Sequence, residues 1–244
     1  MKAVIFSGTT EGRTLSRVVA ALGADVTVCV ATDLGAEEQG CAPGITVRAG
    51  RLDAGEMTAL LQGAALCVDA THPYATEATR NIRAAATAAG VAYHRLLRPA
   101  SDLPAGSVVL ETAAQAAAYL AAKPGNVLLA TGAKELPAFA ALDPARLYPR
   151  VLPTLAGITA CEAAGIPHRN IIAMQGPFTL ELNVALLRQF AIAAMVTKDG
   201  GAAGGFAEKA EAAARCGVQL IVLRRPEEQG ENAETILQRC RELL

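Results

Sequence analysis

A carboxylate, a hydroxyl and an imidazole occur within four positions of the chain, at Asp69, Thr71 and His72. Imidazole is the side chain that gains and loses a proton near neutral pH, so this group has the chemistry of a proton donor or acceptor. Pro73 follows directly, and a proline holds the residue before it in an extended conformation. Two interpretations stay open here: a reactive site, or a turn in which Thr71 caps the next helix.

The residues on either side predict the elements that position this group. Residues 66–68 are apolar and typical of a buried strand. Pro73 suits the first turn of a helix, and residues 75–86 continue with a helical pattern that closes near Gly90. In open α/β sheets, ligands bind where strands end and helices begin. The sequence therefore predicts a ligand site at this strand end.

A second strand end with polar residues lies near the N-terminus. Residues 3–6 predict a strand and residues 14–22 a helix, with a small glycine- and threonine-rich loop between them. Helix N-termini bind phosphate, and glycine lets the backbone approach it closely. The dinucleotide fingerprint is incomplete because Thr10 replaces its second glycine, so a plain turn is the alternative. The predicted cofactor contacts in this loop are Gly8, Thr9, Thr10, Glu11, Gly12 and Arg13, and Asp69 and Thr71 are assigned to the same site.

The second predicted strand, residues 25–31, is followed by an acidic residue, Asp33. An acidic residue at this place usually binds the ribose hydroxyls of NAD and repels the additional phosphate of NADP. Asp33 is therefore predicted to contact the cofactor. The alternative is that Asp33 caps the turn at residues 34–35.

Strand and helix patterns alternate along the whole chain. Further strands are predicted at residues 45–48 and 91–96, and residues 99–106, with two prolines and a glycine, form the predicted linker. The alternation then resumes, with strands at residues 107–110, 126–130, 147–151, 170–174, 193–196 and 219–223. The predicted fold is α/β, with two Rossmann-like parallel-sheet domains that face each other across a cleft. Residues 1–98 form the dinucleotide-binding domain, and residues 107–244 form a second α/β domain that binds substrate.

Polar side chains recur at the ends of the predicted strands in the second half. Three of them, Lys134, Arg150 and Lys198, are cationic, which favours a ligand that carries carboxylates or phosphates. The carboxyl ends of parallel strands share one edge of a sheet, so these groups are expected to lie near one another. The predicted substrate contacts are Lys134, Arg150, Gln175, Thr197 and Gly200.

Composition narrows the classes of function. The 244 residues are 52% hydrophobic and carry a formal charge of -1, so no general basic field attracts nucleic acid. No signal peptide precedes the first strand and no apolar run is long enough to span a membrane, so a cytoplasmic protein without a membrane partner is expected. The cysteines show no C-x-x-C pair, so no metal is expected; they are Cys29, Cys41, Cys67, Cys161, Cys216 and Cys240.

The chain resembles the precorrin-6A reductases of cobalamin synthesis. The resemblance lies in residues 7–13, 69–75, 95–99 and 197–201, and its most specific part is Asp69-Ala70-Thr71-His72-Pro73. It implies a nicotinamide-dependent oxidoreductase that reduces a tetrapyrrole, precorrin-6A or its cobalt form, to the 6B form. A hydride is delivered to one carbon of the macrocycle and a proton to its neighbour. The candidate catalytic residues are His72, Lys198 and Asp199.

Residues 31–37 resemble the cobalt-containing, anaerobic branch of this family, in which NADH is the usual donor. Asp33 and Glu37 favour NADH on physical grounds as well, because their charges repel a 2′-phosphate. Arg13 or Arg51 offers a partner for that phosphate, so NADPH stays open as the alternative. NADH is the predicted cofactor.

Other classes of protein fit the sequence less well. Another NAD(P)-dependent dehydrogenase or a nucleotide-sugar enzyme of the short-chain type needs a Tyr-x-x-x-Lys pair, and none of the four tyrosines has a lysine at that spacing. A two-lobed ligand-binding protein is expected to carry a secretion signal. A methyltransferase that uses S-adenosylmethionine on a related sheet remains a third alternative. The sequence does not fix the oligomeric state.

Overall fold

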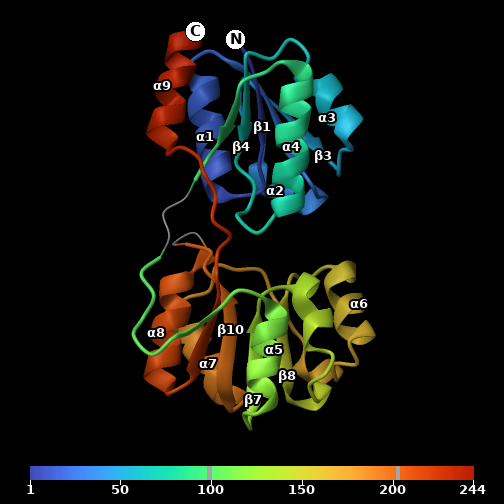
Figure 1. The fold of residues 1–244 in the computed structure, drawn as a ribbon, viewed down its shortest axis with the longest axis vertical. Helices are drawn as coiled ribbons and strands as arrows, with labels where there is room; N and C mark the ends of the chain where they lie inside the picture. Colours follow the sequence, from blue (N-terminus) through green and yellow to red (C-terminus); the bar gives the residue numbers. More distant parts are fainter. Residues whose placement is uncertain (98–100, 202–203) are drawn as a thin grey trace. The chain divides into compact units, whose positions relative to one another are not determined.

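The computed structural model describes residues 1–97, 101–201 and 204–244. These residues form two compact units (Figure 1). Unit 1 comprises Met1–Arg98 and Pro226–Leu244, and unit 2 comprises Pro99–Arg225. Each unit is an α/β structure built on one sheet in which all the paired strands are parallel. The predicted fold class of two parallel-sheet α/β domains is confirmed.

The sheet of unit 1 has the strand order β3-β2-β1-β4-β5. Its strands are β1 (Lys2–Phe6), β2 (Asp25–Val30), β3 (Ile45–Ala49), β4 (Leu66–Asp69) and β5 (Tyr93–Arg95). The strand order reverses between β1 and β4, so the ligand crevice of such a sheet lies at their carboxyl ends. The helices are α1 (Thr10–Ala21), α2 (Asp33–Gln39), α3 (Ala54–Leu61), α4 (Thr76–Ala89) and α9 (Ala233–Leu243).

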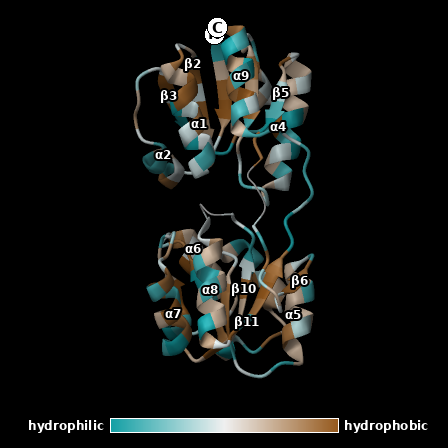
Figure 2. Ribbon diagram, turned by 90° about the vertical axis from the view of Figure 1, so that its left-hand side faces the viewer, coloured by the Kyte–Doolittle hydropathy of each residue, from teal (hydrophilic) through white to brown (hydrophobic). Residues whose placement is uncertain are grey.

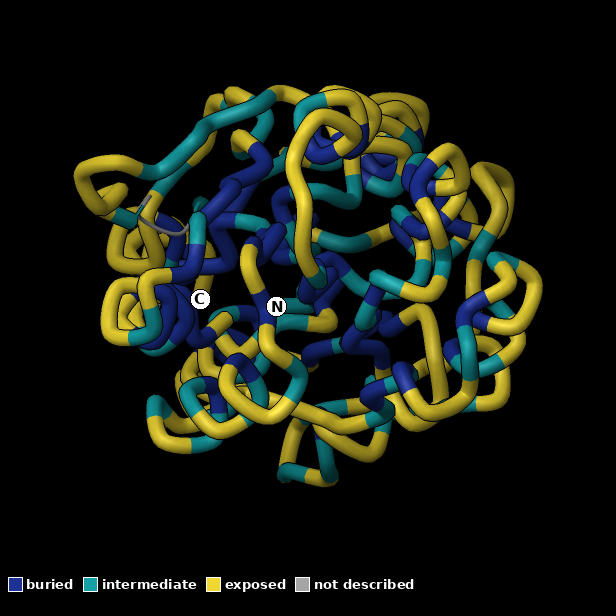
Figure 3. The backbone as a smooth tube through the Cα atoms, turned by 90° about the horizontal axis from the view of Figure 1, so that it is seen from below, coloured by how far each residue is buried: buried dark blue, intermediate teal, exposed yellow. Residues whose placement is uncertain are grey.

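The alternation of side chains along each strand creates two hydrophobic layers in unit 1. Ile5 of β1 packs into a cluster with α1 and α9 on one face of the sheet. Its neighbours Val4 and Phe6 pack with α3 and α4 on the other face. Figure 2 shows hydrophobic strands between helices that have mixed faces, and Figure 3 shows buried chain in the interior with exposed turns around it.

The C-terminal segment belongs to unit 1, whereas the sequence assigns it to the second domain. Its first part runs beside β5: the Leu97 N–H donates to the Glu231 carbonyl, and the Glu231 N–H donates to the Arg95 carbonyl. Helix α9 then fills the face of the sheet next to α1 with Ile236 and Cys240, which are both 0% exposed. These long-range contacts explain why the domain boundary predicted from local pattern differs from the observed one.

The sheet of unit 2 has the order β6-β11-β10-β7-β8-β9, and its order reverses between β7 and β10. Its strands are β6 (Val108–Leu110), β7 (Asn126–Ala130), β8 (Leu147–Val151), β9 (Ile172–Ala173), β10 (Ile192–Lys198) and β11 (Gln219–Leu223). Its helices are α5 (Ala113–Ala121), α6 (Leu155–Ala163), α7 (Leu180–Gln189) and α8 (Phe206–Cys216), with short 3-10 turns at η1 (Ala133–Phe139), η2 (Pro144–Arg146) and η3 (His168–Asn170). Helices α5 and α6 pack on one face, and α7 and α8 on the other.

The predicted linker, residues 99–106, is only partly described, since residues 99 and 100 lie outside the described residues. The rest of it is bonded within unit 2. Ser101 donates to Asp199, and the Gly106 carbonyl accepts from the Gln219 side chain. None of the helices in the described part of the chain is long and apolar enough to cross a membrane.

Candidate functional site

The loop between β1 and α1 is fixed by a threonine. The Thr9 hydroxyl accepts from the Gly12 N–H at 3.1 Å and donates to the Ala70 carbonyl at 2.8 Å. It therefore caps α1 and ties the loop to the end of β4. A Cβ on Gly12 would clash with the Ser7 hydroxyl and lie 2.9 Å from Cβ of Ala70. Glycine at position 12 thus lets helix α1 pack closely against both strand ends.

The same loop has two features that fit a bound phosphate. Gly8 is exposed with a φ of +113°, and a Cβ built there would meet nothing within 4 Å. Ser7 is 7% exposed, and its buried hydroxyl finds no hydrogen-bond partner in the described structure. Open space beside Gly8, an unsatisfied buried hydroxyl and the positive end of helix α1 together match the requirements of an anion.

The remaining predicted contacts of this loop have varied surroundings. Thr10 is exposed and Glu11 is half-buried at the start of α1. The Arg13 guanidinium donates to the Glu38 carbonyl at 2.8 Å, so it holds the C-terminal end of α2. Helix α2 itself was not predicted, because its first residues have the composition of a turn.

Asp33 is the first residue of α2 and is exposed. The cap of this helix is Thr32, whose hydroxyl accepts from the Gly35 N–H at 3.1 Å. The alternative in which Asp33 caps the turn is therefore wrong. Asp33 lies three residues after the end of β2, and Glu37 lies one turn further along the same helix.

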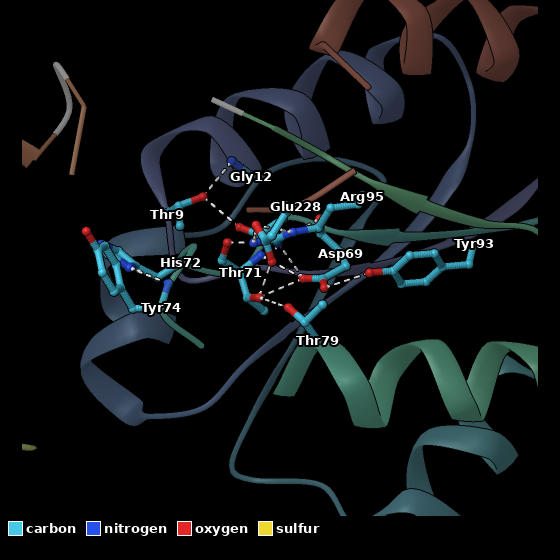
Figure 4. A network of polar contacts seen from close by, with 11 residues as sticks. Thr9, Gly12, Asp69, Thr71, His72, Tyr74, Thr79, Tyr93, Arg95 and Glu228 are labelled. Atoms are coloured by element: carbon cyan, nitrogen blue, oxygen red, sulfur yellow. Dashed lines mark hydrogen bonds and ion pairs between the residues drawn. The ribbon is translucent and has the colours of Figure 1, made fainter. Parts of the chain in front are cut away.

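Asp69 is a buried hub rather than a surface ligand contact. It is 0% exposed, and its carboxylate accepts from the Thr71 N–H and hydroxyl, from the Arg95 guanidinium and from the Tyr93 hydroxyl (Figure 4). These bonds are between 2.7 and 3.0 Å long. Burial, followed by the Asp69 charge, raises the pKa of Tyr93 above its usual value, so the phenol is a stable donor. Asp69 therefore positions Thr71.

Arg95 extends this hub to a distant part of the chain. Its side chain is 1% exposed and forms 2.9 Å ion pairs with Asp69 and with Glu228. It also donates to the Thr71 carbonyl at 2.9 Å. Glu228 belongs to the segment that returns from unit 2, so this segment is tied to the end of β4. Sequence reasoning missed Tyr93 and Glu228, whose partners lie 24 and 133 residues away.

His72 follows the hub on the loop between β4 and α4. Its Nδ1 accepts from the Tyr74 N–H at 3.3 Å, and the two rings lie 5.4 Å apart. In the neutral imidazole the proton then resides on Nε2. Helix α4 begins at Thr76 after Ala75, and no side chain caps it. The alternative in which Thr71 caps this helix is therefore wrong.

In unit 2, residues at the end of β10 are held in place by internal bonds. The Lys198 ammonium pairs with Glu135 at 2.7 Å, and its side chain is 17% exposed. Asp199 accepts from the Ser101 N–H and hydroxyl and from the Gly201 N–H. Thr197 is 0% exposed within the sheet. Asp199 and Thr197 thus shape the strand end, and Lys198 is the more open of these side chains.

Arg150, the residue before the last in β8, lies in an unusual environment. It is 8% exposed, donates to the amide oxygen of Asn183 at 2.8 Å and lies over the Phe178 ring at 4.2 Å. Burial lowers its pKa to about 10. The predicted contacts Lys134 and Gln175 are both exposed.

Gly200, also predicted to contact substrate, is buried, and a Cβ there would lie 3.2 Å from Cα of Gly204. Its role is close packing of the loop after β10. Within unit 1 the structure brings together the loop after β1 and residues 69–72. Within unit 2 it places Lys198, Asp199 and Arg150 at the carboxyl ends of strands of one sheet.

Two parallel sheets, each with a switch point where its strand order reverses, define an α/β protein of the Rossmann-like class. The chain belongs to the family described as precorrin-6x reductase CbiJ/CobK, whose model matches residues 2–241. The resemblance found in the sequence is confirmed.

Individual relatives agree with this family. A cobalt-precorrin-6A reductase of Priestia megaterium is 37% identical over 230 residues, which cover 91% of this chain and 90% of the relative. The enzyme of the same name from Methanothermobacter thermautotrophicus is 34% identical over 237 residues, covering 93% and 77%. A solved CobK precorrin-6A reductase superposes with a TM-score of 0.81 at 25% identity and covers 99% of this chain and 97% of that one.

Proposed function

We propose that the chain reduces precorrin-6A, or its cobalt form, to the 6B form with hydride from a nicotinamide cofactor, as a step of cobalamin biosynthesis. Membership of the reductase family supports this reaction and the use of a nicotinamide cofactor. The observation in the structure that carries the proposal is the loop after β1, which has a buried Ser7 hydroxyl without a hydrogen-bond partner in the described structure and open space at the neighbouring residue Gly8.

The residues present in unit 1 fit the cofactor. The Ser7 hydroxyl, the backbone at Gly8 and the N-terminus of α1 would hold the pyrophosphate. When bound, the nicotinamide supplies the hydride. Asp69 is proposed to affect cofactor binding only indirectly, because its carboxylate already accepts hydrogen bonds from Thr71, Tyr93 and Arg95. It keeps the loop that carries His72 in one conformation.

NADH is proposed as the donor in preference to NADPH. Asp33 begins the helix after β2 and is exposed, so its charge can interact with the ribose hydroxyls and opposes a 2′-phosphate. Arg13 is engaged with the Glu38 carbonyl. Arg51 is exposed in the loop before α3 and is the competing partner for a phosphate.

Unit 2 is proposed to hold the tetrapyrrole, which carries acetate and propionate carboxylates around its ring. Arg150 supports this role most strongly, because it is buried with a neutral amide as its hydrogen-bond acceptor. Lys134 and Gln175 are exposed, and Lys134 adds a positive charge for a further carboxylate. Lys198 reaches the same strand edge while paired with Glu135.

His72 is proposed to give the proton that accompanies the hydride. The Tyr74 N–H occupies Nδ1, so Nε2 is the nitrogen that carries a transferable proton. Lys198 is the alternative donor, and its pairing with Glu135 favours a role as a cationic anchor instead.

Equilibrium titration of the full chain with NADH and with NADPH, followed by turnover of precorrin-6A and its cobalt form at 340 nm, tests the proposal. We expect saturable binding of a reduced dinucleotide and substrate-dependent loss of absorbance. Absence of dinucleotide binding, or binding without oxidation in the presence of either substrate, would refute it.

A further inference from the structure

Two cationic side chains are buried in unit 2 with no carboxylate bonded to either among the described residues. Lys209 of α8 and Arg150 of β8 are each 8% exposed. Arg150 bonds only the neutral amide oxygen of Asn183, and the Lys209 ammonium forms no hydrogen bond or ion pair with any residue that the structure describes. In the sequence, Lys209 lies in a helical run of alanine and glutamate and looks like an ordinary surface lysine.

Packing brings these two residues into one cluster. A Cβ on Gly205 would lie 3.6 Å from Cβ of Pro177 and 3.9 Å from the backbone nitrogen of Phe178. The Lys209 N–H donates to the Gly205 carbonyl, so Lys209 lies one helical turn further along α8. Arg150 covers the ring of Phe178. The segment at residues 177–178 therefore lies next to Gly205, which caps α8, and against the Arg150 guanidinium.

The charges around Lys209 do not compensate for its burial. Burial and the Arg150 charge lower its pKa, Glu208 and Asp199 oppose this effect, and the result is about 8. The Asp199 carboxylate is already bonded to Ser101 and Gly201. One carboxylate oxygen of Glu208 is buried without a partner in the described structure. Buried charges in proteins are normally paired, and neither carboxylate is hydrogen-bonded to Lys209 or Arg150, so both cations can accept a further anionic partner.

We propose that Lys209 and Arg150 together bind one carboxylate of the substrate. This inference rests on the proposed function, in which unit 2 holds a ring that carries several carboxylates. A guanidinium accommodates a carboxylate in a flat, two-point geometry, while an ammonium acts as a point charge from another direction. One carboxylate can therefore satisfy both cations at once.

Binding of uroporphyrin I, a porphyrin with eight carboxylates, to the full chain tests this assignment. We compare the chain with Lys209→Met, Arg150→Met and the double variant by fluorescence titration at pH 7. Each single change is expected to raise the Kd by roughly 10- to 100-fold, because a charge-assisted hydrogen bond is lost. In the double variant, Kd should rise by less than the product of the two single increases, since both cations hold the same carboxylate. Lys123→Met, at an exposed lysine over Tyr119, is the matched control and should leave the Kd unchanged.

Thermal unfolding distinguishes a binding residue from a structural one. Replacing an unpaired buried ammonium by methionine should leave Tm unchanged or raise it, even though binding weakens. A lowered Tm with an unchanged Kd would show that Lys209 serves a structural pair with Glu208, and would overturn the inference. If the unaltered chain binds no uroporphyrin, the substrate role of unit 2 fails as well. Binding that is unaffected by Lys209→Met overturns the inference alone.

A second measurement needs no variant. Burial and the Arg150 charge lower the pKa of the Lys209 amine to about 8, so in the free protein a larger share of this amine is neutral at pH 8.5 than at pH 6.5. A bound carboxylate favours the ammonium, so binding should take up protons from the buffer. Calorimetric titration in two buffers of different ionisation enthalpy measures this uptake. We expect net uptake at pH 8.5 and little at pH 6.5, and equal enthalpies in both buffers at pH 8.5 would contradict the proposal.

Discussion

Gly8 combines a backbone conformation that other residues avoid with empty space where a side chain would lie. Gly8→Val is expected to abolish dinucleotide binding, since the side chain fills the space proposed for the pyrophosphate. The positive φ also costs roughly 1–3 kcal/mol of folding free energy. Gly63→Val is the matched control, because Gly63 has a φ of +71° and equally open surroundings in the same unit. Denaturation should show a similar decrease in the free energy of unfolding for both variants, whereas only Gly8→Val should lose dinucleotide binding. Full dinucleotide affinity in Gly8→Val would place the pyrophosphate elsewhere.

His72 is held with Nε2 as the nitrogen that carries the proton. His72→Ala should lower kcat by about 10²- to 10⁴-fold, the usual contribution of a general acid. Because a general acid acts only in its protonated form, the rate of the unaltered chain should fall as pH rises, and the variant should lack that limb of the pH–rate profile. His168→Ala, at an exposed histidine paired with Glu162, serves as the control. A loss of less than tenfold with an intact profile would assign His72 a positioning role.

Asp33 is exposed at the end of β2 and is free of the capping role, which Thr32 performs. Asp33→Asn should therefore narrow the preference for NADH over NADPH, by roughly tenfold for every 1.4 kcal/mol of repulsion removed. Asp25→Asn, at the exposed opposite end of β2, is the control and should leave the preference for NADH over NADPH unchanged. Steady-state kinetics with both donors measure the ratio, and a preference for NADPH in the unaltered chain would contradict the prediction.

At the scale of elements, the strand end that carries Asp69 is held by an arginine with two carboxylate partners. Arg95→Met should destabilise the chain by roughly 3–5 kcal/mol, because it leaves the buried Asp69 charge uncompensated. Arg224→Met removes an exposed ion pair with Glu111 and should lower the free energy of unfolding by only about 0–1 kcal/mol. Urea denaturation measures both variants. An equal decrease in the free energy of unfolding for Arg95→Met and Arg224→Met would show that the contacts around Asp69 do not stabilise the chain.

The contrast between these elements shows what local pattern can and cannot predict. Strands β1, β4 and β7 are continuous apolar runs, and the sequence predicts them to within one or two residues. Helix α2 was missed because its first residues read as a turn. The hub at Asp69 was read as a ligand contact, since its partners Tyr93, Arg95 and Glu228 are far away in sequence. The burial of Lys209 is equally invisible in the sequence, because it depends on tertiary packing within unit 2.

At the scale of the molecule, unit 1 is built from both ends of the chain, and α9 completes one hydrophobic layer of its sheet. The chain therefore leaves unit 1 at its β5 edge and returns there through the segment that carries Glu228 and Glu231. This arrangement ties the C-terminal segment through Arg95 to the end of β4, which also contacts the loop after β1. It also means that neither unit corresponds to one half of the sequence.

The two-ended construction of unit 1 gives the last prediction. Ile236→Ala, at a fully buried position of α9, should destabilise unit 1 by roughly 2–5 kcal/mol through the cavity it leaves. Backbone hydrogen exchange should then become faster in strands β1 to β5, although β1 lies over 200 residues before the substitution. Exchange in β7 and β10 of unit 2 should stay slow. Leu243→Ala, at a side chain that is 49% exposed in the last turn of the same helix, should leave both units unchanged. If exchange instead became faster only in unit 2, helix α9 would belong to the second domain, as the local sequence pattern predicts.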